Sequence, residues 1–335
     1  MLRAHALMLP ENPGGGANHY PMAAEALEAL GFEESIAEHW IEDAPRYGGE
    51  LGRVHGIEDR TQANEALGSY DRFGDWLDFF RNALRDGPWR PVVAEWAPRL
   101  APALCAAAFH GVIRTGHAVR ALRQRDTLPR RMELAAGLAY WAARYEELPT
   151  AAPVDGEERA LGQVLAELES PWIEDRTDVD FFSVVARMKE RPIAPPVRLE
   201  ETGRSPREDL QDIVREAATG FLEMLVLERN RTWLLHTVTG PAAVEWLLPE
   251  VDRHGGRALV EYSRQSVVAM YTAYGEPFTA RRHLRSSPGD WTTHIASAVE
   301  RRSVHGIKLI DALVRFDRDG DPLWRSVAAQ WSEWT

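Results

Sequence analysis

Residues 18–31 indicate the fold class most clearly, and they read NHYPMAAEALEALG. Asn18 is a typical helix N-cap, and Pro21 is tolerated in a first helical turn. Gly31 is a typical residue at a helix end. Between these signals, apolar side chains recur with the period of a helix and form one stripe that includes a histidine: His19, Met22, Ala23, Ala26, Leu27 and Leu30. The stretch therefore predicts an amphipathic helix with His19 on its apolar face.

Similar helical patterns follow along the chain, whereas no stretch alternates as a β-strand does. We expect further helices at about 33–43, 71–86, 90–124, 130–147, 157–170, 207–236, 241–249, 257–274, 290–316 and 321–333. A Pro-rich connection at 191–206, either a domain linker or a long loop, separates an N-terminal half, 1–190, from a C-terminal half, 207–335. We predict an all-α fold, a single large multi-helix unit over 1–335 with a buried histidine-rich pocket, because the candidate site residues are divided between the halves.

The composition restricts the classes of partner. The 335 residues are 44% hydrophobic and 27% charged, as in globular proteins. A net charge of −12 opposes binding to nucleic acid, and no apolar window or complete signal peptide predicts a membrane or secreted protein. We expect a cytoplasmic protein in which the one cysteine, Cys105, is a buried, inert thiol. No feature of the sequence assigns an oligomeric state.

Two histidines and an arginine share one face of an expected helix at residues 107–117, AAFHGVIRTGH. His110 and His117 are seven residues apart, nearly one above the other, and Arg114 lies between them. Alanines on the same face leave room either for a ligand or for a closely packed helix. The pattern fits hydrogen-bonded structural histidines as well as a binding site.

His236 and Lys308 are further candidate site residues, and they lie in the C-terminal half. His236 precedes an expected helix end at Gly240, where the helix dipole would favour a histidine. Lys308 lies on an apolar stripe in residues 304–316, and it is one of only 2 lysines beside 37 arginines among the 39 basic residues. Its stem could snorkel to water or its ammonium could pair with Asp311. Alternatively, burial lowers its pKa and it serves as an amine or, after reaction with carbon dioxide, as a metal-binding carbamate.

Four segments resemble, in order and spacing, the questin oxidase family: NHYPMAAEAL at 18–27, HGVIRTGH at 110–117, LHTVT at 235–239 and HGIKL at 305–309. Members of this family are all-α proteins that oxygenate and open anthraquinone-type rings in fungal polyketide pathways, and they have bacterial relatives. The resemblance implies a non-haem iron held by histidines and a carbamylated lysine, at the matching positions His19, His110, His236, His305 and Lys308.

This chain departs from the fungal pattern at two positions. Fungal members often carry histidines where Met22 and Arg114 stand here. His117, one turn beyond Arg114, is one replacement within reach. His294, eleven residues before His305 on the same face of the expected helix 290–316, is another.

The resemblance implies an oxygenase, either ring-cleaving, Baeyer–Villiger-like or a dioxygenase, that acts with dioxygen on an aromatic polyketide of the anthraquinone type. Such reactions are linked to NADPH, but the glycine run at 13–16 lacks the nucleotide-binding pattern, so we expect the reductant to bind elsewhere or to come from a partner. Five aromatic residues are candidates for the pocket wall, with core packing as the alternative: Tyr140, Trp141, Tyr145, Tyr262 and Tyr271.

Two other functions fit the same residues. A metal-free oxygenase or acid–base enzyme would use His110 or His117 as the base and Arg114 to hold the substrate oxyanion. A helical ligand-binding protein would keep the fold without catalysis. A shared site predicts that His19, His110 and His305 lie near one another.

Overall fold

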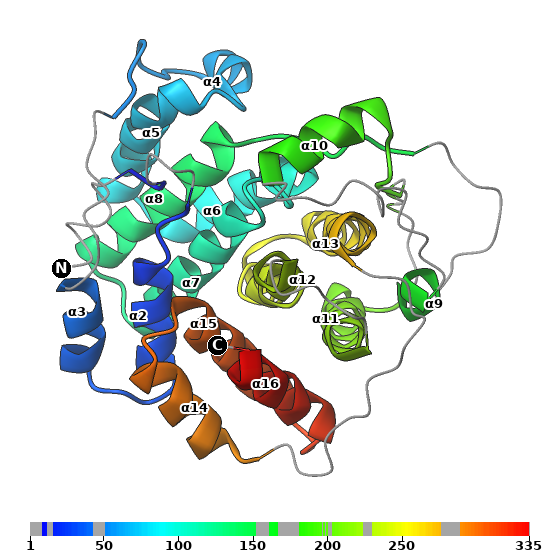
Figure 1. The fold of residues 1–335 in the computed structure, drawn as a ribbon. Coiled ribbons are helices and arrows are strands. Elements are labelled where there is room, and N and C mark those ends of the chain that lie inside the picture. Colours follow the sequence, from blue (N-terminus) through cyan, green and yellow to red (C-terminus); the bar gives the residue numbers. More distant parts are fainter. Residues whose placement is uncertain are drawn as a thin grey trace. The chain divides into compact units, whose positions relative to one another are not determined.

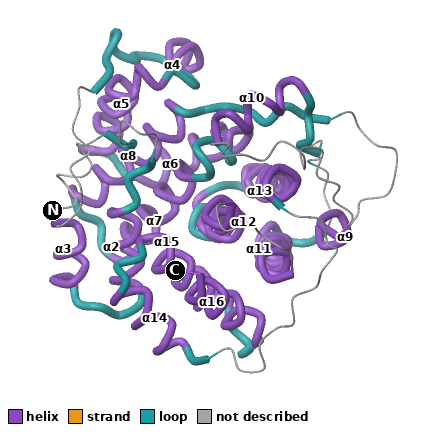
Figure 2. Tube along the Cα trace, in the orientation of Figure 1, coloured by secondary structure: helices purple, strands orange, loops and turns teal. Residues whose placement is uncertain are grey.

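The computed structural model describes residues 9–11, 16–42, 51–151, 161–166, 181–195, 197, 199, 203–223, 230–275 and 289–334. These residues form helices joined by turns, and no strand occurs among them (Figure 2). Extended pairing in this part of the chain consists of two isolated bridges, Glu11 with Ala17 and Thr150 with Ala194. The predicted all-α class is confirmed.

The chain divides into two compact units. Unit 1 comprises Met1–Glu147 and Ala243–Leu259, and unit 2 comprises Leu148–Ala242 and Val260–Thr335. The chain changes unit within α12 (Arg231–Val244) and within α13 (Arg253–Tyr274). These limits do not coincide with the predicted halves, and a single domain over 1–335 stays a prediction.

Unit 1 is organised around α7 (His110–Gln124), which packs against α2 (Tyr20–Ala29) and α8 (Leu128–Ala143) (Figure 1). The close approach of α7 and α8 requires a glycine, because a Cβ on Gly111 would lie 2.7 Å from the Cα of Trp141. The other elements of unit 1 are α3 (Glu34–Glu42), α4 (Arg60–Ala66), η1 (Tyr70–Arg72), α5 (Phe73–Arg85), α6 (Trp89–Leu100), η2 (Ala101–Ala103) and η5 (Leu248–Glu250).

Unit 2 packs α16 (Pro322–Trp334) against α11 (Pro206–Glu223), α14 (Trp291–Glu300) and α15 (Val304–Phe316). It also contains α9 (Leu161–Ala166), α10 (Phe181–Glu190) and most of α12 and α13. Tyr271 of α13 joins α11, since its hydroxyl donates to the carbonyl of Ala217 at 2.6 Å. A buried face on each helix thus supplies the core of this unit.

Several helix limits differ from the prediction. The expected helix 90–124 is interrupted at 101–109, and the expected helix 290–316 is interrupted at 301–303, where Arg302 has φ 52°. The expected end at Gly240 does not occur, because α12 continues through Pro241 to Val244. Burial of the flanking residues outweighs the hydrogen bond lost at the proline. Helices α4 and α10 were not predicted.

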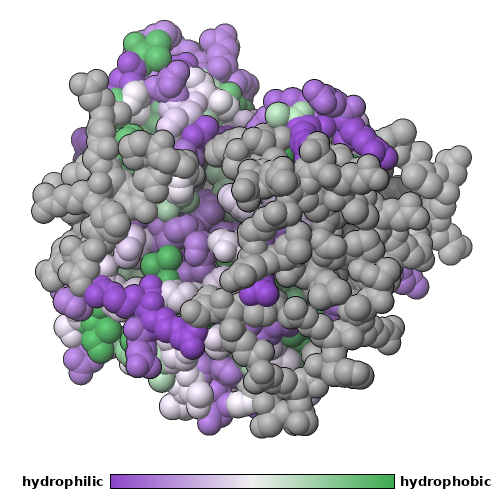
Figure 3. All heavy atoms as spheres, in the orientation of Figure 1, coloured by the Kyte–Doolittle hydropathy of each residue, from purple (hydrophilic) through white to green (hydrophobic). Residues whose placement is uncertain are grey.

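Five expected segments lie partly outside the described residues: the helices at 33–43, 157–170 and 207–236, the Pro-rich connection at 191–206, and the glycine run at 13–16. Cys105 is buried, as predicted. No described helix has both the length and the apolar character needed to cross a membrane. On the face in Figure 3, hydrophobic residues of the described part are scattered among polar ones.

Candidate metal centre

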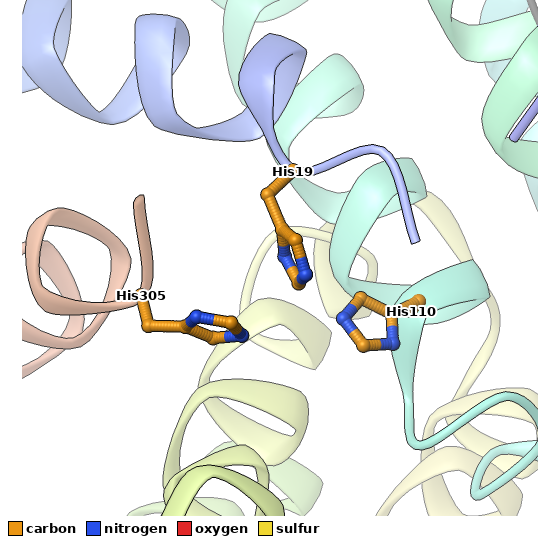
Figure 4. Close-up of side chains that lie close together, drawn as sticks. All are labelled: His19, His110 and His305. Carbon is orange, nitrogen blue, oxygen red and sulfur yellow. The ribbon is translucent and has the colours of Figure 1, made fainter. Parts of the chain in front are cut away.

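Unit 1 brings the first two predicted histidines together. His19 is the N-cap of α2, and His110 is the first residue of α7. Their rings meet edge to face with centroids 4.7 Å apart, and each offers a ring nitrogen within 4.8 Å of the other's. Figure 4 shows the two side chains extending toward each other from the starts of their helices. A single metal ion that bonds to both ring nitrogens at about 2.1 Å requires a separation between these nitrogens close to the one observed.

A backbone carbonyl fixes the orientation of His110. Its Nδ1 lies 2.6 Å from the carbonyl oxygen of Ala107. Because a carbonyl only accepts hydrogen bonds, Nδ1 carries the proton and Nε2 carries the lone pair. Metal-binding histidines are typically held in this way, with one ring nitrogen donating to the protein and the other facing the ion. The local geometry therefore prepares His110 as a ligand through Nε2.

An unusual turn presents that carbonyl. Ala107, Ala108 and Phe109 have φ values of 48°, 52° and 66°, so three consecutive non-glycine residues are left-handed immediately before α7. Each such residue costs about 1–2 kcal/mol relative to right-handed backbone. Strain of this kind persists where the surrounding packing holds it, and it concentrates at functional sites. No local signal indicates this turn, because residues 101–109 contain no glycine or asparagine.

Unit 2 contains a second histidine pair. His236 lies in the interior of α12. His305, which Figure 4 labels, lies in the first turn of α15. Their ring centroids are 5.3 Å apart and their planes are nearly perpendicular, at 83°. The interpretation of His236 as a residue at a helix C-terminus is wrong, because α12 continues beyond it to Val244. His236 is buried, so its polar ring is placed inside this unit.

Lys308 follows His305 by one turn of α15 and is 1% exposed. The snorkelling interpretation is therefore wrong, since the ammonium does not reach water. Burial lowers the pKa of Lys308 to about 7. Its neighbour Asp311 forms an ion pair with Arg315 at 3.5 Å. An amine with this pKa is partly neutral at physiological pH, which is the form that reacts with carbon dioxide.

The predicted replacement histidines lie elsewhere in their units. His294 belongs to α14, not to the helix of His305, because residues 301–303 separate α14 from α15. The expected shared helix face is therefore wrong. His117 lies two turns beyond His110 on α7, and its Nδ1 is 2.6 Å from a carboxylate oxygen of Glu25 on α2.

Glu25 is the functional candidate that the sequence reading missed. It is buried in α2 and accepts hydrogen bonds from both His117 and Arg120. Burial disfavours its charged form, but Arg120 and His117 outweigh burial and lower its pKa to about 2. A single acid within the apolar run Ala23, Ala24, Ala26 and Leu27 was the available signal.

A small pocket lies beside this carboxylate, at the meeting of α2, α7 and α8. Arg114 and His117 line it together with acids, a second arginine and small apolar side chains, namely Pro21, Met22, Glu25, Glu28, Ala118, Ala121, Arg130 and Glu133. Along α2 and α7, His19 thus contacts His110, Met22 and Arg114 both line the pocket, and Glu25 contacts His117.

Three of the five candidate aromatic residues are core residues. Tyr140, Trp141 and Tyr271 are buried, and each donates a hydrogen bond within its own unit. Tyr145 donates to Glu147 at the surface, and Tyr262 is half-buried on α13. None of the five lines the pocket between α2, α7 and α8 in the described part of the chain.

Comparison with known proteins identifies one family. A family model described as questin oxidase-like matches residues 17–313, which is most of the chain. The matched range includes Lys308 and the four candidate ligand histidines, His19, His110, His236 and His305. No curated protein matches the chain.

Proposed function

Since the chain belongs to the questin oxidase-like family, we propose that it is an oxygenase acting on an aromatic polyketide of the anthraquinone type, with a non-haem iron as cofactor. The iron ligands in this proposal are His19, His110, His236, His305 and Lys308. The observation that carries the proposal is the histidine pair of unit 1, in which the Ala107 carbonyl holds His110 with the proton on Nδ1 and the lone pair on Nε2.

The donor set fits iron. Imidazole nitrogens suit iron and several other transition metals, and an oxygen ligand beside them is typical of non-haem iron oxygenases. Each unit supplies two histidines in ring contact. A pair provides only two ligands, so the proposal requires that both pairs serve the same ion.

Lys308 would supply the oxygen ligand as a carbamate. Its neutral amine forms a bond to the carbon of carbon dioxide and releases a proton, which leaves a carboxylate-like group. Burial favours the neutral amine that this step needs, and arginine could not replace it because guanidinium stays charged.

Bound iron would supply the redox chemistry that activates dioxygen. The chain's own residues position it: the Ala107 carbonyl fixes the tautomer of His110, and the N-terminus of α2 places His19 beside it. We propose that the reductant NADPH, where the reaction uses it, binds elsewhere or that its electrons come from a partner, since the glycine run at 13–16 lacks the nucleotide-binding pattern.

Dioxygen uptake with a polyhydroxylated anthraquinone tests the proposal. The iron-loaded chain should consume dioxygen, the chelated chain should not, and added iron should restore uptake. His110→Ala should abolish uptake without changing helix content, whereas His254→Ala, at an exposed position on α13, should leave it unchanged. Uptake that persists after iron removal would overturn the iron proposal and support the metal-free alternative.

A further inference from the structure

The pocket between α2, α7 and α8 contains three buried or half-buried carboxylates, each matched by one arginine. Glu25 pairs with Arg120, Glu28 pairs with Arg130 at 3.0 Å, and Glu133 pairs with Arg114 at 2.6 Å. With His117 neutral, these charges cancel. A ligand that arrived as an anion would add an uncompensated charge, so the pocket suits a ligand that arrives neutral.

Arg114 has a donor directed to such a ligand. Its Nε and Nη2 donate to the two carboxylate oxygens of Glu133 at 2.6 and 3.0 Å. The third nitrogen, Nη1, is buried and has no hydrogen-bond partner among the described residues. Arg114 is 1% exposed and lines the pocket. Since a buried guanidinium N–H requires an acceptor, a ligand oxygen is the natural occupant.

His117 provides a proton acceptor in the same pocket. Glu25 is ionised and can only accept, so the 2.6 Å contact requires the proton on His117 Nδ1. The neighbouring Arg120 nitrogen, 3.3 Å from Nδ1, therefore does not donate to it. This tautomer leaves the Nε2 lone pair as the basic site of the ring, and the Glu25 carboxylate would balance the imidazolium formed on protonation.

We propose that this pocket binds the hydroxyl group of a phenol and removes its proton. The O–H bond breaks, an N–H bond forms at His117 Nε2, and the electron pair remains on the phenolate oxygen, which accepts a hydrogen bond from Arg114 Nη1. The ligand enters neutral and is held as an ion pair, with Arg114 beside the phenolate and Glu25 beside the imidazolium.

The size of the pocket restricts how the phenol binds. The centre of a water molecule can occupy about 20 Å³ of it, which is room for a hydroxyl group but not for an aromatic ring. The ring would therefore lie outside, toward the more exposed Glu28–Arg130 pair. This binding mode rests on the proposed function only in that an anthraquinone-type substrate carries such hydroxyls.

The test uses the full-length chain without iron and 4-nitrophenol, whose phenolate is yellow and whose neutral form is colourless. At a pH where the free probe is colourless, wild-type protein should produce a saturable yellow signal. His117→Gln, which can still donate to Glu25, should give no yellow signal. Arg114→Lys, which can still pair with Glu133, should weaken binding at least tenfold. The surface changes His254→Gln and Arg85→Lys should behave as wild type.

Absence of the signal with wild-type protein, or an equal signal in His117→Gln, would overturn the proposal. Circular dichroism and thermal unfolding establish that each variant folds, and the His117→Gln result decides the question where Arg114→Lys does not fold. Iron binding is measured separately on the same proteins. Failure of phenol binding with normal iron content would therefore leave the proposed oxygenase intact.

Discussion

At the scale of single residues, the buried amine of Lys308 distinguishes the carbamate proposal from ordinary packing. Lys308→Met keeps the apolar volume and removes the amine, so iron should be lost while the free energy of unfolding of the iron-free chain at pH 7 stays equal or rises by about 1 kcal/mol. Lys308→Arg places a permanent charge at a 1% exposed position and should lower that free energy by about 3–5 kcal/mol. Elemental analysis and urea unfolding measure both. Full iron content in either variant would contradict a ligand role.

The lowered pKa of Glu25 predicts that the free energy of unfolding decreases in acid. Its folded-state pKa is about 2, below the ordinary value of 4.5, because Arg120 and His117 outweigh the effect of burial. Its stabilising contribution is therefore complete above pH 4.5 and is lost as the pH falls toward 2. Between pH 6 and pH 3 this loss amounts to about 2 kcal/mol.

Glu25→Gln removes that titration. Urea unfolding should show that the difference in free energy of unfolding between wild type and Glu25→Gln narrows by this amount between pH 6 and pH 3. A difference that stays constant over the range would mean that the carboxyl titrates alike in the folded and unfolded chain.

Sequence reasoning located single residues unevenly. His19 and His110 stand on apolar faces of expected helices, which indicates a site there, and their rings are in contact. The sequence does not indicate a role for Glu25, although a buried acid needs the partners that His117 and Arg120 provide. Its partners lie on a different helix, and no local pattern indicates such pairing.

At the scale of elements, strain in the left-handed turn before α7 should lower the free energy of unfolding. Ala108 has φ 52°, where an alanine is strained and a glycine is not. Ala108→Gly should therefore raise the free energy of unfolding by about 1 kcal/mol. The matched change Ala94→Gly, at an exposed position inside α6, should lower it by about 1 kcal/mol. Equal destabilisation by both changes would contradict the strained geometry.

The helical character of the segments was predictable, whereas the residues at which the helices begin and end were less so. The stripe at 18–31 predicted α2 closely, because the proline and glycine signals agree with the apolar period, although the N-cap is His19 and not the expected Asn18. The interruption at 101–109 was not predictable, because alanine-rich segments favour helix locally and only tertiary packing imposes the turn. Pro241 predicted a helix end that does not occur, because α12 continues through it where the flanking residues are buried.

At the scale of the whole molecule, the predicted halves and the observed units differ because residues 243–259 return to unit 1. A Pro-rich stretch is a local signal, whereas unit membership depends on contacts between segments distant in sequence. The proposed iron centre likewise depends on residues distant in sequence, namely His19, His110, His236, His305 and Lys308.

The most direct test of that centre is the iron content per chain of protein purified without an affinity tag. We expect one iron per chain in wild type and in His254→Ala, and almost none in His19→Ala or in His305→Ala. Two irons per chain, or full iron content in either His19→Ala or His305→Ala, would contradict a single centre built from both histidine pairs.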